Sequence, residues 1–265
     1  MKKAIFYIII SLAVCILFAF LYAAYQYYTP PTERASYQMR QHNDNLRIAY
    51  IGDSWAFIHK RKHQCLINNI IEDSCHVQTR IYSYGLSGRT SKEIYEAIFD
   101  DEELRQMLQN YKYDYCIVSA GINDANKKMS IKYYQKSMDC IIRYLLSNHV
   151  RPIILEIPDY DIQKIFRWER KDRKILRRLS MVINRVPMDC KKAFRKALAE
   201  LIHDTEYQDK VSIIRYKAWN SHYEEDQKKL YLIDGVHLNE YGNHVLDSVI
   251  AKEIISNISN YENRH

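Results

Sequence analysis

The segment that most restricts the fold is residues 46–55, where an apolar run stops abruptly at Gly52-Asp53-Ser54. Short apolar runs of this kind are typical of strands buried in a parallel sheet. In open parallel sheets, ligands bind at the carboxyl ends of the strands. The sequence therefore predicts a serine hydroxyl at the edge of a cleft, although the same triplet also fits an ordinary turn.

Strand-like and helix-like segments alternate along the rest of the chain, and 265 residues suit one such domain. Thr90 and Glu93 form a capping-box signature at the start of one helix. Strands are predicted near 46–52, 77–84, 115–120, 152–157 and 211–216, and helices over 59–73, 130–148, 164–185, 189–203 and after Thr90 and Asn239. The expected fold is a three-layer α/β/α domain with a five-stranded, mostly parallel sheet.

An uncharged apolar run extends from Ala4 to Tyr25, and about 20 such residues cross the hydrocarbon core of a bilayer. A cleaved signal peptide has an apolar region of only about 7 to 15 residues and small residues at its cleavage site, where this chain has Leu21 or Tyr22. A lipoprotein cysteine at Cys15 fits poorly, because a large residue precedes it and the apolar run continues. An uncleaved transmembrane anchor is predicted.

The chain is accordingly divided into an anchor at 1–25, a polar linker at 26–45 that contains Pro30-Pro31, and a folded domain at 46–265. Lys2 and Lys3 precede the apolar run. By the positive-inside rule, the C-terminal domain is expected outside the cytoplasm, in a periplasmic or extracellular location.

The net charge is +7 and the pI is near 8.9. No nucleic-acid-binding motif accompanies this charge, so nucleic acid is not a predicted partner. Nine Lys or Arg residues gather in 164–185, and the simplest interpretation is a solvated helix face. The alternative is a position near the cleft or the bilayer that attracts anionic glycan or lipid headgroups.

Among the six cysteines, Cys65 and Cys75 are candidates for a disulfide across a loop. Cys116 lies in an apolar run, so it is predicted to be a core residue.

Five residues carry groups suited to acyl transfer: Ser54, Gly88 and Asn123 after predicted strands, and Asp234 and His237 in one late loop. A serine hydroxyl becomes a nucleophile when a neighbouring base, here the histidine, removes its proton. An aspartate can hold the imidazole ring and its tautomer. The backbone N–H groups of Ser54 and Gly88 and the amide of Asn123 are suitable oxyanion donors.

Four blocks follow one another along the chain: Gly52-Asp53-Ser54, Gly88, Gly121-x-Asn123-Asp124 and Asp234-x-x-His237. In these blocks and in their order, the chain from about Leu46 onward resembles the SGNH hydrolase superfamily, also called GDSL esterases and lipases. The resemblance implies a flavodoxin-like fold and serine-dependent ester chemistry without a cofactor or metal. It also implies Ser54 as nucleophile, His237 as base, Asp234 as its partner, and Ser54, Gly88 and Asn123 as the oxyanion hole. Trp55 replaces the leucine of the family pattern and is expected to shape the acyl pocket.

Two other enzyme classes fit fewer of these residues. Gly52-x-Ser54-x-Ala56 half resembles the nucleophile elbow of α/β hydrolases, but here the serine follows the first strand and the acid and base lie three residues apart. A metal hydrolase using Asp53, Asp124, Asp234 and His237 would leave Ser54 and Gly88 without a role, and no His-Glu-x-x-His pattern is present.

The leading hypothesis is an esterase or acyltransferase that acts on O-acetyl or other short acyl esters of cell-surface or exported polysaccharide, held at the membrane by residues 4–25. A transferase would need a membrane-bound acyl-donor protein as partner. The alternatives are a lipase, lysophospholipase or thioesterase for longer acyl chains, and a catalytically silent glycan-binding module. A wide apolar cleft favours longer chains, and a shallow polar cleft favours acetyl esters.

Overall fold

The computed structural model describes residues 2–34, 45–62, 64–167, 169–203 and 207–262. In this part of the chain, five parallel strands form one sheet in the order β2-β1-β3-β4-β5. The strands are β1 (Leu46–Gly52), β2 (Thr79–Gly85), β3 (Tyr115–Ser119), β4 (Arg151–Leu155) and β5 (Ser212–Ile214). Strands β1, β3 and β4 are almost entirely buried, as their apolar runs predict.

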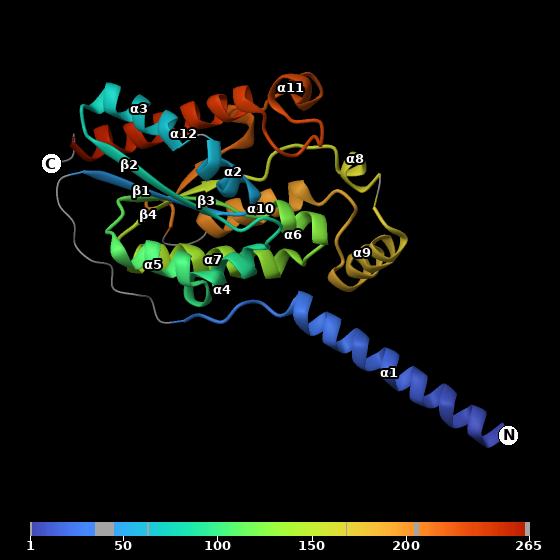
Figure 1. Cartoon of the computed structure of the whole chain (residues 1–265). Coiled ribbons are helices and arrows are strands. Elements are labelled where there is room, and N and C mark those ends of the chain that lie inside the picture. The colour runs from blue at the N-terminus through green and yellow to red at the C-terminus, as the bar shows by residue number, and fades with distance from the viewer. Residues whose placement is uncertain (1, 35–44, 63, 168, 204–206, 263–265) are drawn as a thin grey trace.

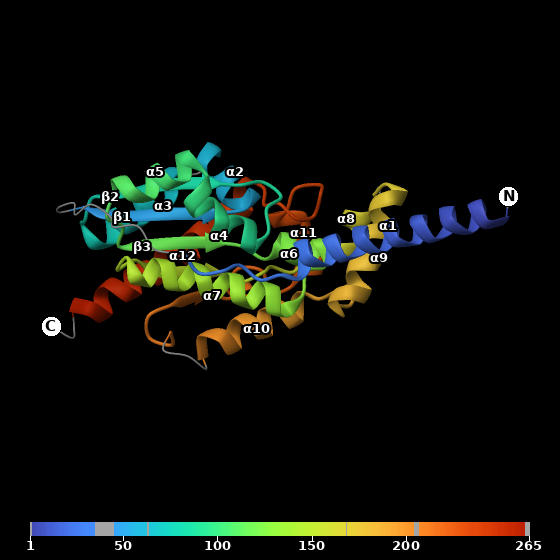
Figure 2. The same ribbon diagram turned by 90° about the horizontal axis from the view of Figure 1, so that it is seen from below.

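Helices cover both faces of the sheet, which confirms the predicted three-layer fold (Figure 1). One layer contains α2 (Ser54–Lys62), α3 (Gln64–Cys75), α11 (Tyr223–Leu230) and α12 (Glu240–Glu262). The other contains α4 (Ser91–Asp100), α5 (Glu102–Asn110), α7 (Ile131–Ser147) and α10 (Lys191–His203). Beyond the carboxyl ends of the strands lie α6 (Ile122–Lys127), α8 (Ile162–Phe166) and α9 (Lys171–Asn184), as Figure 2 also shows.

Capping residues in the sequence predicted the starts of two helices correctly. Thr90 N–H donates to Glu93 Oε2 at 2.8 Å, and Glu93 N–H donates back to Thr90 Oγ1 at 3.4 Å, so the capping box is confirmed. Asn239 Oδ1 accepts a hydrogen bond from Gly242 N–H at 2.9 Å and caps α12. Cys116 is fully buried in the core, as predicted.

Two helix predictions and one candidate disulfide were wrong. The single helix predicted at 59–73 is two helices, α2 and α3, and α2 begins earlier than predicted, directly after β1, where Asp53 Oδ1 accepts the Trp55 N–H at 3.0 Å. The basic segment 164–185 is also two helices, α8 and α9. Cys65 and Cys75 both belong to α3, whose rise of about 1.5 Å per residue sets their Cα atoms roughly 15 Å apart, too far for a disulfide.

The N-terminal helix α1 (Lys2–Tyr28) is long and apolar enough over Lys2–Tyr25 to cross a membrane, and none of that stretch is buried. The chain that follows differs from the expected linker, because its first residues pack on the domain. Pro31 is buried, Glu33 pairs with Arg143 at 3.1 Å, and Arg34 pairs with Asp100 at 2.7 Å. Residues 29–34 therefore bind the α4 and α7 layer, while 35–44 lie outside the described residues.

Candidate active site

The site lies at the carboxyl ends of β1, β2 and β3, where the strand order reverses around β1. Gly52 and Ser119 are paired at the ends of β1 and β3. A Cβ atom on Gly52 would lie 2.2 Å from the Ser119 carbonyl oxygen, so only glycine allows the two strands this approach. The chain then enters α2 at Ser54, which fixes the serine at the end of the sheet.

Ser54, His237 and Asp234 form a continuous hydrogen-bonded line. Ser54 Oγ lies 2.8 Å from His237 Nε2, and His237 Nδ1 lies 2.7 Å from Asp234 Oδ2. An ionised carboxylate can only accept, so Nδ1 carries the imidazole proton and Nε2 accepts from the serine hydroxyl. The late loop thus orients the imidazole of His237 toward Ser54.

Asp234 is held by its own loop. Its Oδ1 accepts backbone N–H groups from Val236 at 2.9 Å and His237 at 3.0 Å. Partial burial favours the neutral acid, but the His237 hydrogen bond and these two N–H groups outweigh it and lower the pKa of the Asp234 carboxyl. One short turn with the spacing Asp-x-x-His therefore keeps the Asp234 carboxylate charged and fixes the orientation of the His237 imidazole.

Three hydrogen-bond donors belong to residues that line the same cleft as the Ser54 hydroxyl. Ser54 is the first residue of α2, where N–H groups have no intrahelical partner. Gly88 is exposed and has φ of +75°, and a Cβ there would meet no atom within 4 Å. Asn123 Nδ2 donates one hydrogen bond to Arg89 O at 3.0 Å, which fixes its amide and leaves a second N–H for another acceptor.

The sequence did not indicate how Gly88 and Asn123 are held together. Asp124, fully buried, accepts hydrogen bonds from Ser91 N–H at 2.8 Å and Ser91 Oγ at 2.6 Å. Burial raises the pKa of Asp124 to about 6, and the Ser91 hydrogen bonds oppose this. The bonds join the start of α6 to the start of α4, so Asp124 acts on the site by positioning its neighbours.

Asp53, which directly precedes Ser54 in the sequence, is a second buried carboxyl group. It is fully buried, and burial raises its pKa to about 7, against the hydrogen bond from Trp55 N–H and the attraction of His237. The folded state therefore binds this proton more tightly than the unfolded chain does. Its contribution to the unfolding free energy must fall as pH rises from about 4 to about 7.

Asp53→Asn is expected to remove this pH dependence. The unfolding free energy of the wild type, minus that of the variant, should decrease as pH rises from about 4 to about 7, by up to roughly 4 kcal/mol for a shift of this size. Urea denaturation of both proteins at each pH measures it. Parallel pH profiles for the two proteins would contradict the assignment.

All five predicted site residues line one cleft of about 770 Å³. Its other walls are mainly apolar, and two basic side chains, Lys164 and Arg167, also reach it. The apolar lining residues are Phe57, Ile58, Ile122, Ile165, Ile233 and Val236. The expectation that Trp55 shapes the acyl pocket was wrong, because its side chain is buried and packs edge-on against Trp219 at 5.6 Å.

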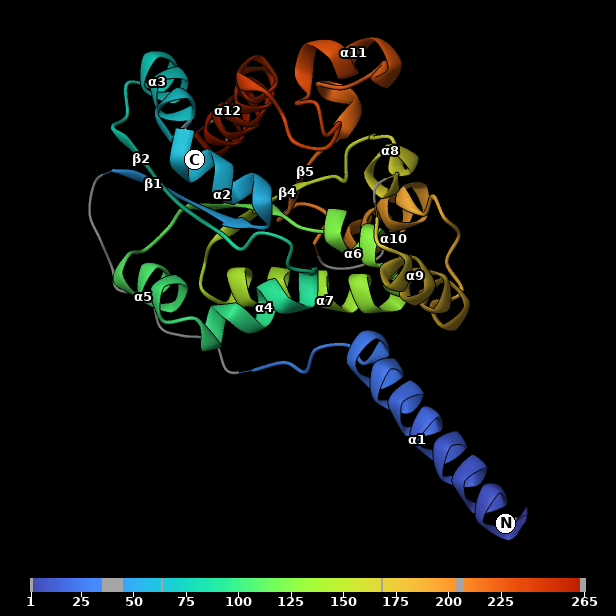
Figure 3. The same cartoon turned by 45° about the vertical axis from the view of Figure 1, so that its right-hand side comes forward.

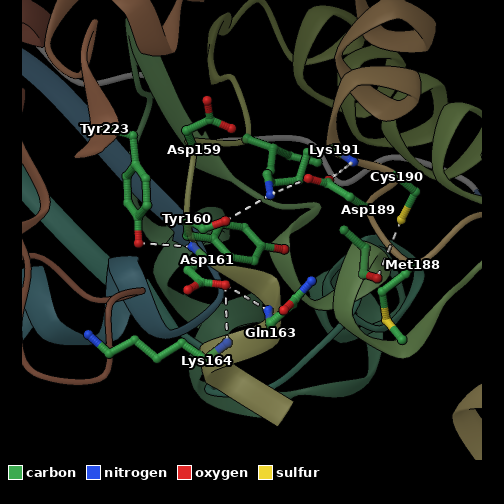
Figure 4. Close-up of polar contacts among 12 residues, drawn as sticks. Asp159, Tyr160, Asp161, Gln163, Lys164, Met188, Asp189, Cys190, Lys191 and Tyr223 are labelled. Atoms are coloured by element: carbon green, nitrogen blue, oxygen red, sulfur yellow. Dashed lines mark hydrogen bonds and ion pairs between the residues drawn. The ribbon is translucent and has the colours of Figure 1, made fainter. Parts of the chain in front are cut away.

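A second cavity of about 1020 Å³ lies on the other side of α8 and is lined mostly by polar residues. Figure 4 shows the contacts that build its wall. Asp161 Oδ1 accepts the backbone N–H groups of Gln163 and Lys164 and caps α8, and Tyr223 Oη accepts the Asp161 N–H at 2.9 Å. Buried Lys191 donates to Tyr160 O at 2.8 Å. Helix α8 therefore separates an apolar cleft from a polar one.

A serine aligned with a histidine and an aspartate at the end of a parallel α/β sheet is the arrangement of a serine hydrolase. A model of the GDSL-like lipase/acylhydrolase family matches residues 48–249. The chain belongs to the GDSL-like lipase/acylhydrolase family.

Solved structures of the same fold include a lipase/acylhydrolase from Enterococcus faecalis, with 16% identity, a TM-score of 0.52 and coverage of 80% of this chain and 96% of that one. An acetyl xylan esterase, AlAXEase, also has 16% identity and a TM-score of 0.52, over 79% of this chain and 100% of that one. At these identities the likeness shows the fold alone. No protein of curated function matches the chain.

Proposed function

We propose that Ser54 is the nucleophile of this ester hydrolase, with His237 as general base, Asp234 as its orienting partner and Ser54, Gly88 and Asn123 as the oxyanion hole. The observation that carries the proposal is the line from Ser54 Oγ through His237 to Asp234, with contacts of 2.8 and 2.7 Å, inside the same cleft as the three donors.

The reaction proceeds by two acyl transfers. Ser54 Oγ attacks the ester carbonyl carbon and passes its proton to His237 Nε2, and the oxyanion forms beside the three donors. His237 then gives the proton to the alcohol oxygen as the ester bond breaks, which leaves an acyl-serine. A water molecule, deprotonated by the same nitrogen, attacks the acyl-serine and releases the acid, and the proton returns to Ser54.

The preferred acyl group in this proposal is longer than acetyl, because the walls beside Ser54 are mainly apolar. Burying each methylene contributes about 0.8 kcal/mol, so burial of only two would favour the longer ester by about tenfold.

We therefore expect p-nitrophenyl octanoate to have a higher kcat/KM than p-nitrophenyl acetate with the full chain in detergent. Ile165→Ser in the cleft wall should raise the KM for octanoate and leave acetate turnover nearly unchanged. Faster turnover of acetate than of octanoate would contradict the longer-chain proposal.

The second candidate is an O-acetyl or other short acyl ester of cell-surface or exported polysaccharide. The polar cavity beyond α8 favours it, because Gln163, Asp189 and Glu224 offer partners to sugar hydroxyl groups. A sugar hydroxyl in place of water would make the enzyme an acyltransferase, supplied by a membrane-bound acyl-donor protein. Release of acetate from an O-acetylated oligosaccharide, or its appearance on an unacetylated one, distinguishes these reactions.

Membrane attachment is part of the proposal. Helix α1 would cross the bilayer over residues 4–25 and hold the domain outside the cytoplasm, since Lys2 and Lys3 precede the apolar stretch and none of it is buried by the domain. Resistance of the full chain to alkaline extraction from membranes tests the anchor, and protease protection in sealed vesicles tests the side.

A further inference from the structure

Helix α9 has an exposed apolar face that no other part of the described chain covers. Ile175, Leu176 and Val182 have exposed fractions of 66%, 59% and 76%. These residues and the half-buried Leu179 recur at helical spacing, so they form one stripe. Large side chains this exposed on a soluble surface mark a contact with something else.

Basic residues accompany this stripe. The helix carries five basic residues and one acidic residue, and among them Lys171, Arg173 and Arg178 are exposed. A helix with an apolar face and a cationic polar face is typical of segments that lie in the surface of a bilayer containing anionic lipids. A soluble partner would have to match both the apolar stripe and the positive charge.

The position of α9 indicates which surface it meets. It contacts α1, whose apolar stretch over Lys2–Tyr25 is not buried in the domain. Figures 1 and 3 both show α9 beside the end of α1 nearest the domain. The ion pairs of Glu33 and Arg34 with the α7 and α4 layer fix this end of the chain against the domain.

We propose that α9 lies on the surface of the membrane that α1 crosses, with Ile175, Leu176 and Val182 among the lipid acyl chains and the basic residues at anionic headgroups. This inference rests on the proposed anchoring by α1 and adds a second membrane contact to it.

The contact also positions the ester cleft. Arg177 pairs with Glu169, and its guanidinium lies 3.6 Å from the centre of the Phe166 ring at the end of α8. Lys164, Ile165 and Arg167 of the same segment line the cleft beside Ser54. A membrane contact through α9 therefore holds the mouth of the cleft close to the bilayer surface.

Tryptophan quenching by brominated lipids tests the proposal with the full chain in nanodiscs that contain phosphatidylglycerol. Leu176→Trp adds a reporter to the stripe, and the wild-type emission is subtracted. Tyr241→Trp, at an exposed residue on α12, in the layer opposite the α4 and α7 layer, is the matched control. We expect the added emission at 176 to be roughly halved by brominated lipid, with little change at 241. Nanodiscs of zwitterionic lipid alone should give weaker quenching at 176.

Two readouts separate the possible failures. Alkaline extraction of the same proteins reports on α1, and ester turnover confirms that the Leu176→Trp domain is folded. If the protein resists alkaline extraction and is active but shows equal quenching at 176 and 241, the α9 contact alone is overturned. Nanodiscs that hold a protein dimer in which residue 176 is shielded from lipid would also overturn the α9 contact. Extraction of the chain by alkali would overturn the anchor and the α9 contact together.

Discussion

Replacing Ser54 with alanine is expected to lower kcat for ester hydrolysis by roughly 10⁴ to 10⁶-fold, because the variant has no atom that can form the acyl-enzyme. The fold should be unaffected, since within the described residues the hydrogen bond of Ser54 Oγ is to His237, on the cleft wall. Turnover of p-nitrophenyl esters measures the loss, and circular dichroism and Tm measure folding.

Ser87→Ala is the matched control for this prediction, because Ser87 is exposed and lines the same cleft. Its kcat should stay within about threefold of the wild type. Residues of a catalytic unit are not additive, so Ser54→Ala combined with His237→Ala should be no slower than Ser54→Ala alone. Wild-type activity in the folded Ser54→Ala protein would exclude the acyl-serine mechanism.

Asn123→Ala should lower kcat by about 10² to 10³-fold with a smaller change in KM, since its amide stabilises charge that develops only in the transition state. The Asn123 side chain is partly exposed, and its hydrogen bond to Arg89 O orients it without supporting the core. The expected cost to the unfolding free energy is therefore no more than about 1 kcal/mol.

Asn126→Ala, in the same helix, is the comparison for Asn123. Asn126 also lines the cleft, but its Oδ1 accepts a hydrogen bond from Tyr160 Oη at 2.9 Å. We expect a small loss of stability and nearly unchanged kcat. Equal losses of kcat in the two variants would mean that the amide of Asn123 contributes cleft polarity rather than oxyanion binding.

Much of the fold follows from local patterns in the sequence. The buried runs that become β1, β3 and β4 are apolar enough to be recognised alone, and the caps at Thr90 and Asn239 are satisfied within a few residues. The short helices α5, α6 and α11 were missed because they are polar and carry no long apolar period. The early start of α2 was missed because it depends on the hydrogen bond from Trp55 N–H to the buried Asp53 side chain.

The sequence by itself determined the chemical groups of the site, because turns such as Asp234-x-x-His237 form a hydrogen-bonded unit on their own. Only the tertiary structure brought Ser54 to His237 across 183 residues, set the Asp124 contact with Ser91, and placed an apolar wall and α8 beside them. It alone showed that one face of α9 stays uncovered next to α1. The physical reason is that hydrogen-bond geometry and periodicity act between near neighbours, whereas burial and cleft lining depend on how distant elements pack.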